Sequence, residues 1–127
     1  MPFNAQGPTV VKGGYAEILK FPAGLDAIAS IVLDASTVTE ASGVRKLKGG
    51  TLLAKNQNGQ YQQYSGPSSV EVKGVLAYDV EFVDGTANDD TPAAMFFHGC
   101  VFRADRIVDF NTHGASARTW LKTCRFD

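Results

Sequence analysis

Residues 51–64 read TLLAKNQNGQYQQY, and this stretch decides the fold. It contains two short runs suited to β-strands, Thr51–Lys55 and Gln60–Tyr64, joined by Asn56-Gln57-Asn58-Gly59. An Asn-Gly step readily adopts the positive φ angles of a tight turn and therefore marks hairpins strongly. We predict a β-hairpin here, around which the other strands of the chain must pair.

The residues before the hairpin mix helical and β signals. Apolar residues recur at helical spacing from Leu25 to Leu33, whereas Ile31-Val32-Leu33 is rich in β-branched residues. We expect a short helix or turn over residues 24–29 and then a strand from about 30 to 33. A short edge strand is predicted over residues 16–21, before Pro22.

Two longer β runs follow the hairpin. Val70–Val83 (VEVKGVLAYDVEFV) is the longest, and Gly74 within it predicts a bulge or bend. A second strand is expected over Ala93–Phe102, with Gly99 in its middle.

The last residues predict helical structure. Ala104–Phe110 is expected to form a short helix or strand, and Asn111-Thr112-His113-Gly114 a turn. Ser116 is a candidate cap for a helix over Ala117–Lys122, which Trp120 would help to anchor.

Short strands at close spacing, with glycine breaks, predict a mainly β domain with one or two short helices (α+β). The expected architecture is a small β-clip or incomplete barrel. The length of 127 residues suits one domain, which we assign to residues 16–127. Residues 1–15 (MPFNAQGPTVVKGGY) are expected to form an extended N-terminal arm, in which Thr9-Val10-Val11 suits pairing along a partner's sheet edge.

Composition excludes several classes of protein. The chain is 44% hydrophobic and 20% charged, as folded domains are, and it lacks the run of about 18 apolar residues that spans a membrane. A net charge of −1 argues against direct nucleic-acid binding. The start, Met1-Pro2-Phe3-Asn4, has no secretory signal pattern, so we expect synthesis in the cytoplasm.

Few residues suit catalysis or metal binding. His98, Cys100, His113 and Cys124 invite a thiol–histidine or zinc interpretation, but they form no known catalytic signature and no paired-ligand spacing. His98 and Cys100 are expected to share one face of a strand and to pack there. We predict a protein that is not an enzyme, with free, buried thiols, no metal and no cofactor.

Two further groups of residues are candidates for ligand binding, but a structural role is more common for each. The loop with Asp84, Asn88, Asp89 and Asp90 has carboxylates for calcium but not the ligand pattern of an EF-hand, so a solvated loop is expected. Tyr61 and Tyr64 are candidates for stacking on single-stranded nucleic acid, although tyrosines in a hairpin are more often structural or interfacial.

A family resemblance emerges from the order of several segments between Ile31 and about Ile107. In chain order they are IVLDASTV (31–38), KLKGGTLLAK (46–55), NQNGQYQQY (56–64), GVLAYDV (74–80) and MFFHGCV (95–101). This succession resembles the lambda-type head-decoration protein D family of tailed phages. In that family a strand that begins with Gly-Thr is followed by a hairpin. A Gly-Val-Leu strand comes next, and then an apolar strand that ends in His-Gly. The first 30 residues and Val108–Asp127 match no family motif.

The resemblance implies a β-clip-like fold and a homotrimer on the outer surface of the virion. It implies the major capsid protein as partner, contacted where its subunits meet around local threefold axes. Binding would follow expansion of the head and would help the shell resist the pressure of packaged DNA. Three copies that grip equivalent sites together gain avidity over one small footprint.

The residues expected to bind the capsid and to form the trimer are chosen on physical grounds, since no family motif identifies them. For a capsid-binding arm we expect Phe3, Pro8, Val10, Val11 and Tyr15 to supply the contacts. Aromatic residues are enriched at interfaces, which makes Tyr61, Tyr64 and Trp120 candidates for the trimer interface.

Two other functions stay open from the sequence. One is another structural component of a virion, such as a tail, connector or receptor-binding module. The other is a small host-directed enzyme that uses Cys100 and a histidine, which would require an exposed and reactive thiol.

Overall fold

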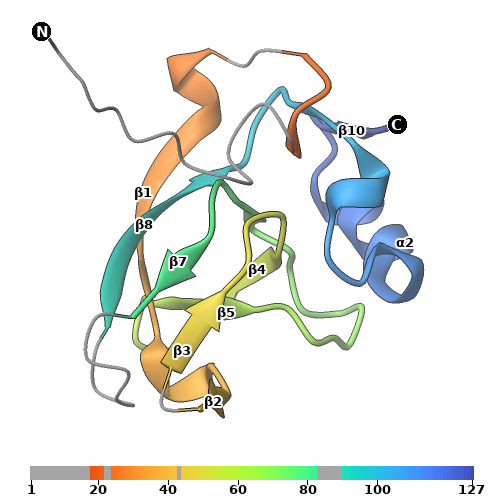
Figure 1. Cartoon of the computed structure of the whole chain (residues 1–127). Coiled ribbons are helices and arrows are strands. Elements are labelled where there is room, and N and C mark those ends of the chain that lie inside the picture. Colours follow the sequence, from red (N-terminus) through yellow and green to blue (C-terminus); the bar gives the residue numbers. More distant parts are fainter. Residues whose placement is uncertain (1–17, 22–23, 43, 83–89) are drawn as a thin grey trace, which may run out of the picture.

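A computed structural model describes residues 18–21, 24–42, 44–82 and 90–127 (Figure 1). The strands are β1 (Ile28–Leu33), β2 (Glu40–Ala41), β3 (Val44–Leu47), β4 (Leu52–Lys55), β5 (Tyr61–Gln63), β6 (Gly74–Leu76), β7 (Val80–Glu81), β8 (Thr91–Phe96), β9 (Val101–Phe102) and β10 (Arg125–Phe126). The helices are η1 (Leu25–Ala27), η2 (Ala35–Thr37), η3 (Ala104–Arg106) and α2 (Phe110–Trp120), of which the first three are short 3₁₀ turns.

Five strands close into a barrel in the order β1-β5-β4-β6-β8. All neighbouring pairs are antiparallel except β1 and β5, which are parallel. Outside the barrel, β2, β3 and β7 form one small sheet, and β9 and β10 form another. The prediction of a mainly β domain with short helices is confirmed, and the expected incomplete barrel is in fact closed.

The hairpin predicted at Asn56–Gly59 is confirmed. β4 and β5 pair in antiparallel fashion, and Lys55 lies opposite Tyr61. The Asn56 N–H donates to Gln60 O at 2.8 Å, and Gly59 has a φ of 81°, which glycine adopts without steric cost. Local turn chemistry therefore sets the register of these two strands.

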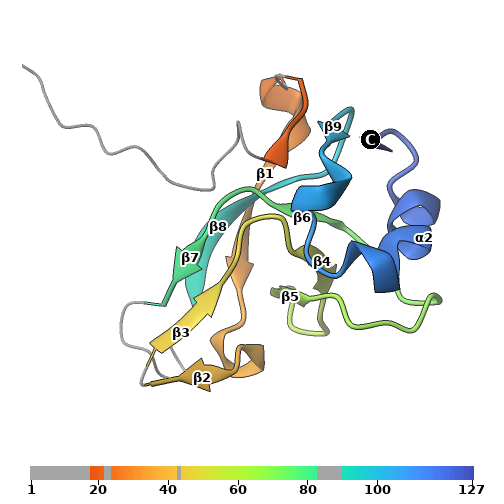
Figure 2. The ribbon, with the colours of Figure 1, turned by 45° about the vertical axis from the view of Figure 1, so that its right-hand side comes forward.

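Two central strands of the barrel, β4 and β6, are buried on both faces, so neighbouring residues in them enter different hydrophobic clusters. Leu52 and Val75 belong to a cluster that also contains Phe102, Phe126 and Leu121, here called the C-terminal cluster. Their neighbours Leu53 and Leu76 belong to a second cluster with Leu33, Met95 and Phe82, here called the barrel cluster. In Figures 1 and 2, α2 and β10 lie on one side of the barrel and β2 and β3 on the other.

The predicted strand over Val70–Val83 is wrong as one element. Its described residues contain only β6 and β7, and the segment before Gly74 is irregular, with a turn in which the Val70 N–H donates to Pro67 O. Gly74 neither bulges nor bends a longer strand, since β6 begins there. A Cβ atom at this position would lie 2.6 Å from Phe96 O, so only glycine lets β6 approach β8 this closely.

The single strand predicted over Ala93–Phe102 is also wrong. Gly99 has a φ of 65°, and the chain turns there, so that β8 ends at Phe96 and β9 begins at Val101. The two strands have different partners, because β8 pairs with β1 and β6 whereas β9 pairs with β10.

The helix near the end begins earlier than predicted. α2 starts at Phe110, so Asn111–Gly114 is helical rather than a turn, and Ser116 lies inside the helix instead of capping it. Gly114 and Ala117 are buried on one face, where a Cβ on Gly114 would lie 3.0 Å from the Phe110 ring. Burial of this small-residue face outweighs the weak helix propensity of the segment.

The expectations for residues 16–33 are partly confirmed. A 3₁₀ turn at Leu25–Ala27 precedes β1, which starts at Ile28 instead of residue 30. In place of an edge strand over residues 16–21, the described part of that segment contains one bridge, between Leu19 and Phe102.

Candidate partner-binding surface

The barrel has a seam between β1 and β5. These strands meet at one pair, Leu33 and Tyr61, beyond which the Asp34 N–H donates to Tyr61 O at 2.9 Å. By contrast, β1 pairs with β8 along all six of its residues. One edge of β1 is therefore fully paired, and the other edge is paired only at its end.

The other edge of β1 presents backbone polar groups. The Phe97 N–H donates to Ala27 O at 2.9 Å, which places Ala27 and Phe97 at a hydrogen-bonded position of the β1–β8 ladder, and such positions alternate with non-bonded ones. It follows that Ile28 and Ser30 direct their N–H and C=O groups away from β8. No further strand within the described ranges pairs with them. An edge of this kind is a template for an added extended segment.

A groove of about 460 Å³ lies over the seam. Its lining includes Ser30 and Val32 from β1, Pro92 from β8, and Lys55 and Tyr61 from the hairpin strands. Val32 lies opposite Pro92 in the β1–β8 register and is 42% exposed. The groove thus combines an apolar floor, one lysine and a strand edge.

Hydrogen bonds hold the rim of the groove in place. Asn56 Oδ1 accepts from the N–H groups of Asn58 and Gln60, each at 3.0 Å, and Asn56 Nδ2 donates to Asp34 Oδ2 at 3.0 Å. The Asp90 carboxylate accepts from the Ala35 N–H and from the Gln60 side chain. Asp90, placed in the predicted solvated loop, thus helps to fix the hairpin; the other three polar residues of that loop lie outside the described residues.

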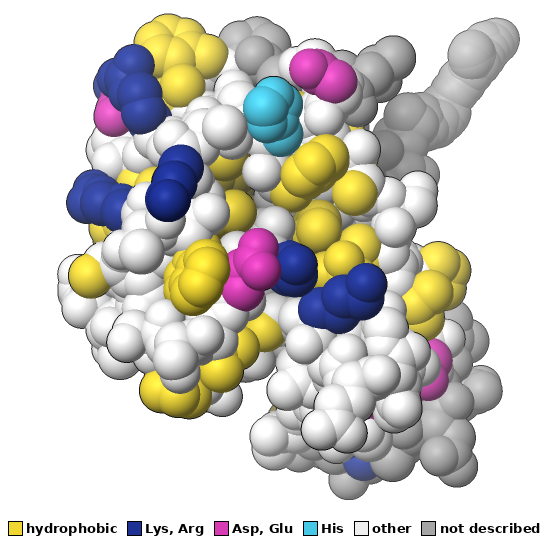
Figure 3. Space-filling view, turned by 180° about the vertical axis from the view of Figure 1, so that it is seen from behind, with side chains coloured by type: hydrophobic (Ala, Val, Ile, Leu, Met, Phe, Trp, Pro, Cys, Tyr) yellow, Lys and Arg dark blue, Asp and Glu magenta, His cyan; other side chains and the backbone are white. Residues whose placement is uncertain are grey.

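Apolar side chains are also exposed elsewhere on the domain. Besides Val32, the large exposed ones are Phe21, Val44, Val70, Phe97 and Trp120. Figure 3 shows the face behind that of Figure 1, where apolar side chains lie among lysines and arginines instead of forming one continuous patch.

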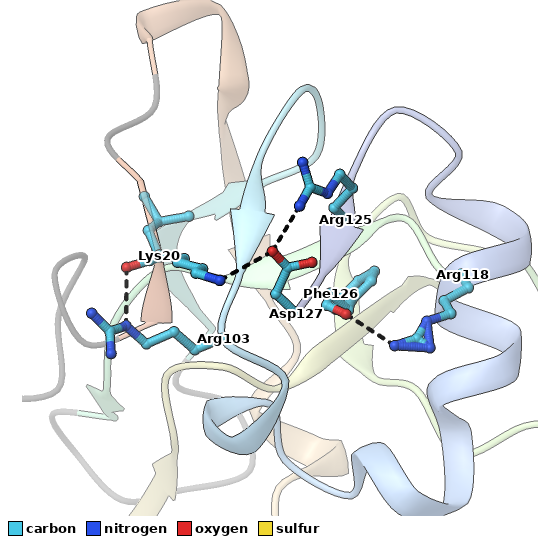
Figure 4. Close-up of polar contacts among 7 residues, drawn as sticks. Lys20, Arg103, Arg118, Arg125, Phe126 and Asp127 are labelled. Atoms are coloured by element: carbon cyan, nitrogen blue, oxygen red, sulfur yellow. Dashed lines mark hydrogen bonds and ion pairs between the residues drawn. The ribbon is translucent and has the colours of Figure 1, made fainter.

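The C-terminal residues are fixed by a polar cluster (Figure 4). Asp127 Oδ2 pairs with Arg125 Nη2 at 2.8 Å and with Lys20 Nζ at 3.3 Å. Arg118 Nη2 donates to Phe126 O at 2.9 Å. Desolvation raises the pKa of the Asp127 carboxyl, but the hydrogen bond from Lys20 and the charges of Arg125 and Lys20 outweigh it and hold that pKa below its usual value.

The predicted interface aromatics differ in position. Tyr61 is half-buried at the seam, and Trp120 is 36% exposed, with its indole N–H donating to Ser68 O at 3.0 Å. Tyr64 is only 3% exposed, and its hydroxyl donates to Pro67 O at 2.8 Å. Tyr64 therefore packs within the domain and has little surface for another copy. The five residues predicted for the arm, Phe3, Pro8, Val10, Val11 and Tyr15, lie outside the described residues.

The two histidines and the two cysteines have different surroundings. The prediction that His98 and Cys100 share a strand face is wrong, because the chain turns at Gly99 and leaves His98 exposed and Cys100 buried. His113 packs against the Tyr64 ring, with 5.1 Å between ring centroids. Cys100 and Cys124 are both free and buried, as expected. Among the described residues, no three His, Cys, Asp or Glu side chains gather as a metal site would require.

Sequence reasoning identified Tyr61 but missed the rest of the groove. Val32 and Pro92 meet only through the β1–β8 pairing, and neither stands out in its own segment. The one available signal was Pro92, since a proline inside a strand marks a position whose N–H is not needed by the ladder.

Comparisons of the chain with protein-family models, with curated proteins and with solved structures find no match. Within the described part of the chain, none of the helices has the length and apolar character needed to cross a bilayer.

Proposed function

We propose that this chain is a non-enzymatic decoration protein of a phage head. It binds the outside of the expanded capsid as a homotrimer at local threefold positions, and it stabilises the shell against DNA pressure. The observation that carries the proposal is the place of the resembling segments in the fold. They contain β4, β5 and β6 and the ends of β1 and β8, which are all strands of one barrel, and they also include parts of β3, β7 and β9 outside it.

The resembling segments follow one another closely between residues 31 and 101. Four of the strands that they contribute to are neighbours in the barrel, in the order β5-β4-β6-β8. The stretch that resembles the family therefore builds most of one barrel, and this supports the proposal of a single decoration domain.

The groove at the seam supplies a contact for the capsid. An extended segment of the major capsid protein, added beside β1, would satisfy the backbone groups of Ile28 and Ser30 and cover Val32 and Pro92. Main-chain pairing of this kind needs no deep pocket. One such contact is weak, but a trimer makes three at once, so the later contacts become intramolecular and the avidity rises by orders of magnitude.

Particle binding tests the proposal directly. The purified chain is sized by light scattering and then sedimented with expanded and with unexpanded shells. We expect a trimer that co-sediments with expanded shells alone. A chain that stays monomeric at every concentration and ignores expanded shells would overturn the proposal, and labelling confined to one vertex would favour a tail or connector component.

Deleting residues 2–15 separates the contribution of the arm. We expect the truncated chain to remain a folded trimer and to bind expanded shells more weakly. Unchanged binding would remove Phe3, Pro8, Val10, Val11 and Tyr15 from the mechanism and leave the groove as the contact.

A matched pair of variants tests the groove itself. Val32→Asp places a charge on the groove floor, and Val44→Asp does the same on a strand outside the barrel, where valine is exposed to a similar extent, 38% against 42%. We expect Val32→Asp to weaken shell binding at least about tenfold relative to Val44→Asp, with both variants folded. Equal binding by the two variants would exclude the groove.

A further inference from the structure

The two cysteines are neighbours across the β9–β10 ladder. These strands pair in parallel, with Val101 opposite Arg125 and Phe102 opposite Phe126. Cys100 stands directly before β9 and Cys124 directly before β10, and the Arg125 N–H donates to Cys100 O at 2.9 Å. Paired strands lie about 4.7–4.9 Å apart, within the window of about 4.4–6.8 Å between Cα atoms that disulfides span.

Both side chains point to the same side of this ladder. Phe102 and Phe126 are buried in the C-terminal cluster, whereas Arg125 is exposed between Cys124 and Phe126. Because side chains alternate along a strand, Cys100 and Cys124 face inward with the two phenylalanines. They are 2% and 9% exposed, and both belong to the C-terminal cluster.

We infer that Cys100 and Cys124 form a thiol–disulfide exchange site, which a small-molecule disulfide converts to an intramolecular disulfide that fixes β10 to β9. The inference does not rest on the proposed capsid role. It concerns how the last residues of the chain are held, and it applies to the protein in any assembly.

The exchange proceeds in two balanced steps. The Cys124 thiolate attacks one sulfur of the small disulfide, forms a mixed disulfide and releases one small thiolate. Cys100 loses its proton to solvent and attacks Cys124 Sγ, which displaces the second small thiolate. Two protein thiols are oxidised to one disulfide, and the small disulfide is reduced to two thiols.

The surroundings of the two thiols indicate which cysteine attacks first and which resolves the mixed disulfide. A hydrogen bond from Cys100 lowers the pKa of Cys124 against the opposing effect of desolvation, and Thr123 adds a further hydrogen bond. The hydrogen bond with Cys124 and desolvation instead raise the pKa of Cys100. Cys124 is also the more exposed of the two thiols. It is therefore the attacking cysteine, and Cys100 resolves the mixed disulfide.

The disulfide would close a loop that contains the whole of α2. Cys100 precedes η3 and Cys124 follows α2, so the bond would constrain the unfolded chain between them. Because the β9–β10 pairing begins directly after the two cysteines, the bond would extend a contact that the folded chain already makes.

The test uses the full chain, reduced, freed of reductant and then treated with 2-hydroxyethyl disulfide. We expect a monomer-mass product that has lost two hydrogen atoms, with a peptide map that links Cys100 to Cys124. Its thermal midpoint is expected to exceed that of the reduced chain by at least about 5 °C. Two free thiols after denaturation, a disulfide between chains or an unchanged midpoint would each overturn the inference.

Two single variants test the order of attack. Cys100→Ala lacks the resolving thiol, so we expect a lasting mixed disulfide at Cys124. Cys124→Ala retains only the more buried thiol, so we expect Cys100 to react at least about tenfold more slowly under the same native conditions. Equal reaction at the two positions would contradict the assigned roles. If either variant fails to fold, the mass and peptide map of the unaltered chain still decide whether the bond forms.

Discussion

The ring of Phe126 stacks on the ring of Phe102, with 5.1 Å between centroids and 26° between ring planes. Phe126 belongs to β10 and Phe102 to β9, and Phe126 also stacks on Phe110 at the start of α2. One aromatic side chain therefore joins the last strand, the strand beside it and the helix into the C-terminal cluster.

Removing that side chain is expected to destabilise the domain strongly. Phe126→Ala leaves a cavity beside the rings of Phe102 and Phe110 and should lower the free energy of unfolding by about 3–5 kcal/mol. Phe21→Ala is the matched control, because Phe21 is 54% exposed and its loss should change stability by less than about 0.5 kcal/mol. Chemical denaturation measures both, and similar values for the two variants would contradict the role given to Phe126.

Gly74 is expected to tolerate no side chain. Gly74→Ala places a Cβ 2.6 Å from Phe96 O and 2.8 Å from Met95 Sδ, so β6 must shift from β8 at a cost of about 2–3 kcal/mol. Gly24→Ala serves as control, since its Cβ would meet only the mobile tip of the Asp26 side chain. Comparing the two denaturation midpoints checks this, and a neutral Gly74→Ala would mean that the β6–β8 contact is looser than described.

The Tyr64 hydroxyl is expected to stabilise the loop that follows β5. Tyr64→Phe leaves the Pro67 carbonyl without the hydrogen bond at 2.8 Å and should cost about 1–2 kcal/mol. In Tyr61→Phe the lost hydroxyl has no hydrogen bond to any described residue, so we expect little change. The two unfolding curves should differ accordingly; if they coincide, the Tyr64 bond contributes nothing measurable.

Asp127 is expected to make the stability of the domain depend on pH in the acid range. Its folded pKa lies below the unfolded value of about 3.9, so the unfolded chain binds the proton more readily. The stabilisation of the folded state by the Asp127 carboxylate is therefore present above the unfolded pKa, and it is lost as the pH falls through the folded pKa. We expect Asp127→Asn to lower the thermal midpoint slightly at about pH 6 and to match the unaltered chain at about pH 2. A difference that is constant with pH would exclude the Lys20 and Arg125 ion pairs as its cause.

Local chemistry explains which structural features could be read from the sequence. The hairpin at Asn56–Gly59 was predictable because Asn-Gly sets its own turn and register. The mainly β character followed from short β-prone runs separated by glycine. The hairpin also places Tyr61 where β5 begins, but its choice as an interface residue stays a prediction.

The groove and the pairing of the cysteine segments were decided only by the tertiary structure, because no local sequence pattern specifies which distant strands pair. The β1–β8 register brings Val32 beside Pro92, and the single contact of Leu33 with Tyr61 leaves the seam that makes the groove. Likewise, the turn at Gly99 separates His98 from Cys100, and the β9–β10 ladder then places Cys100 beside Cys124. Alternation and turn propensity act over a few residues, whereas burial of the two hydrophobic clusters selects which distant strands become neighbours.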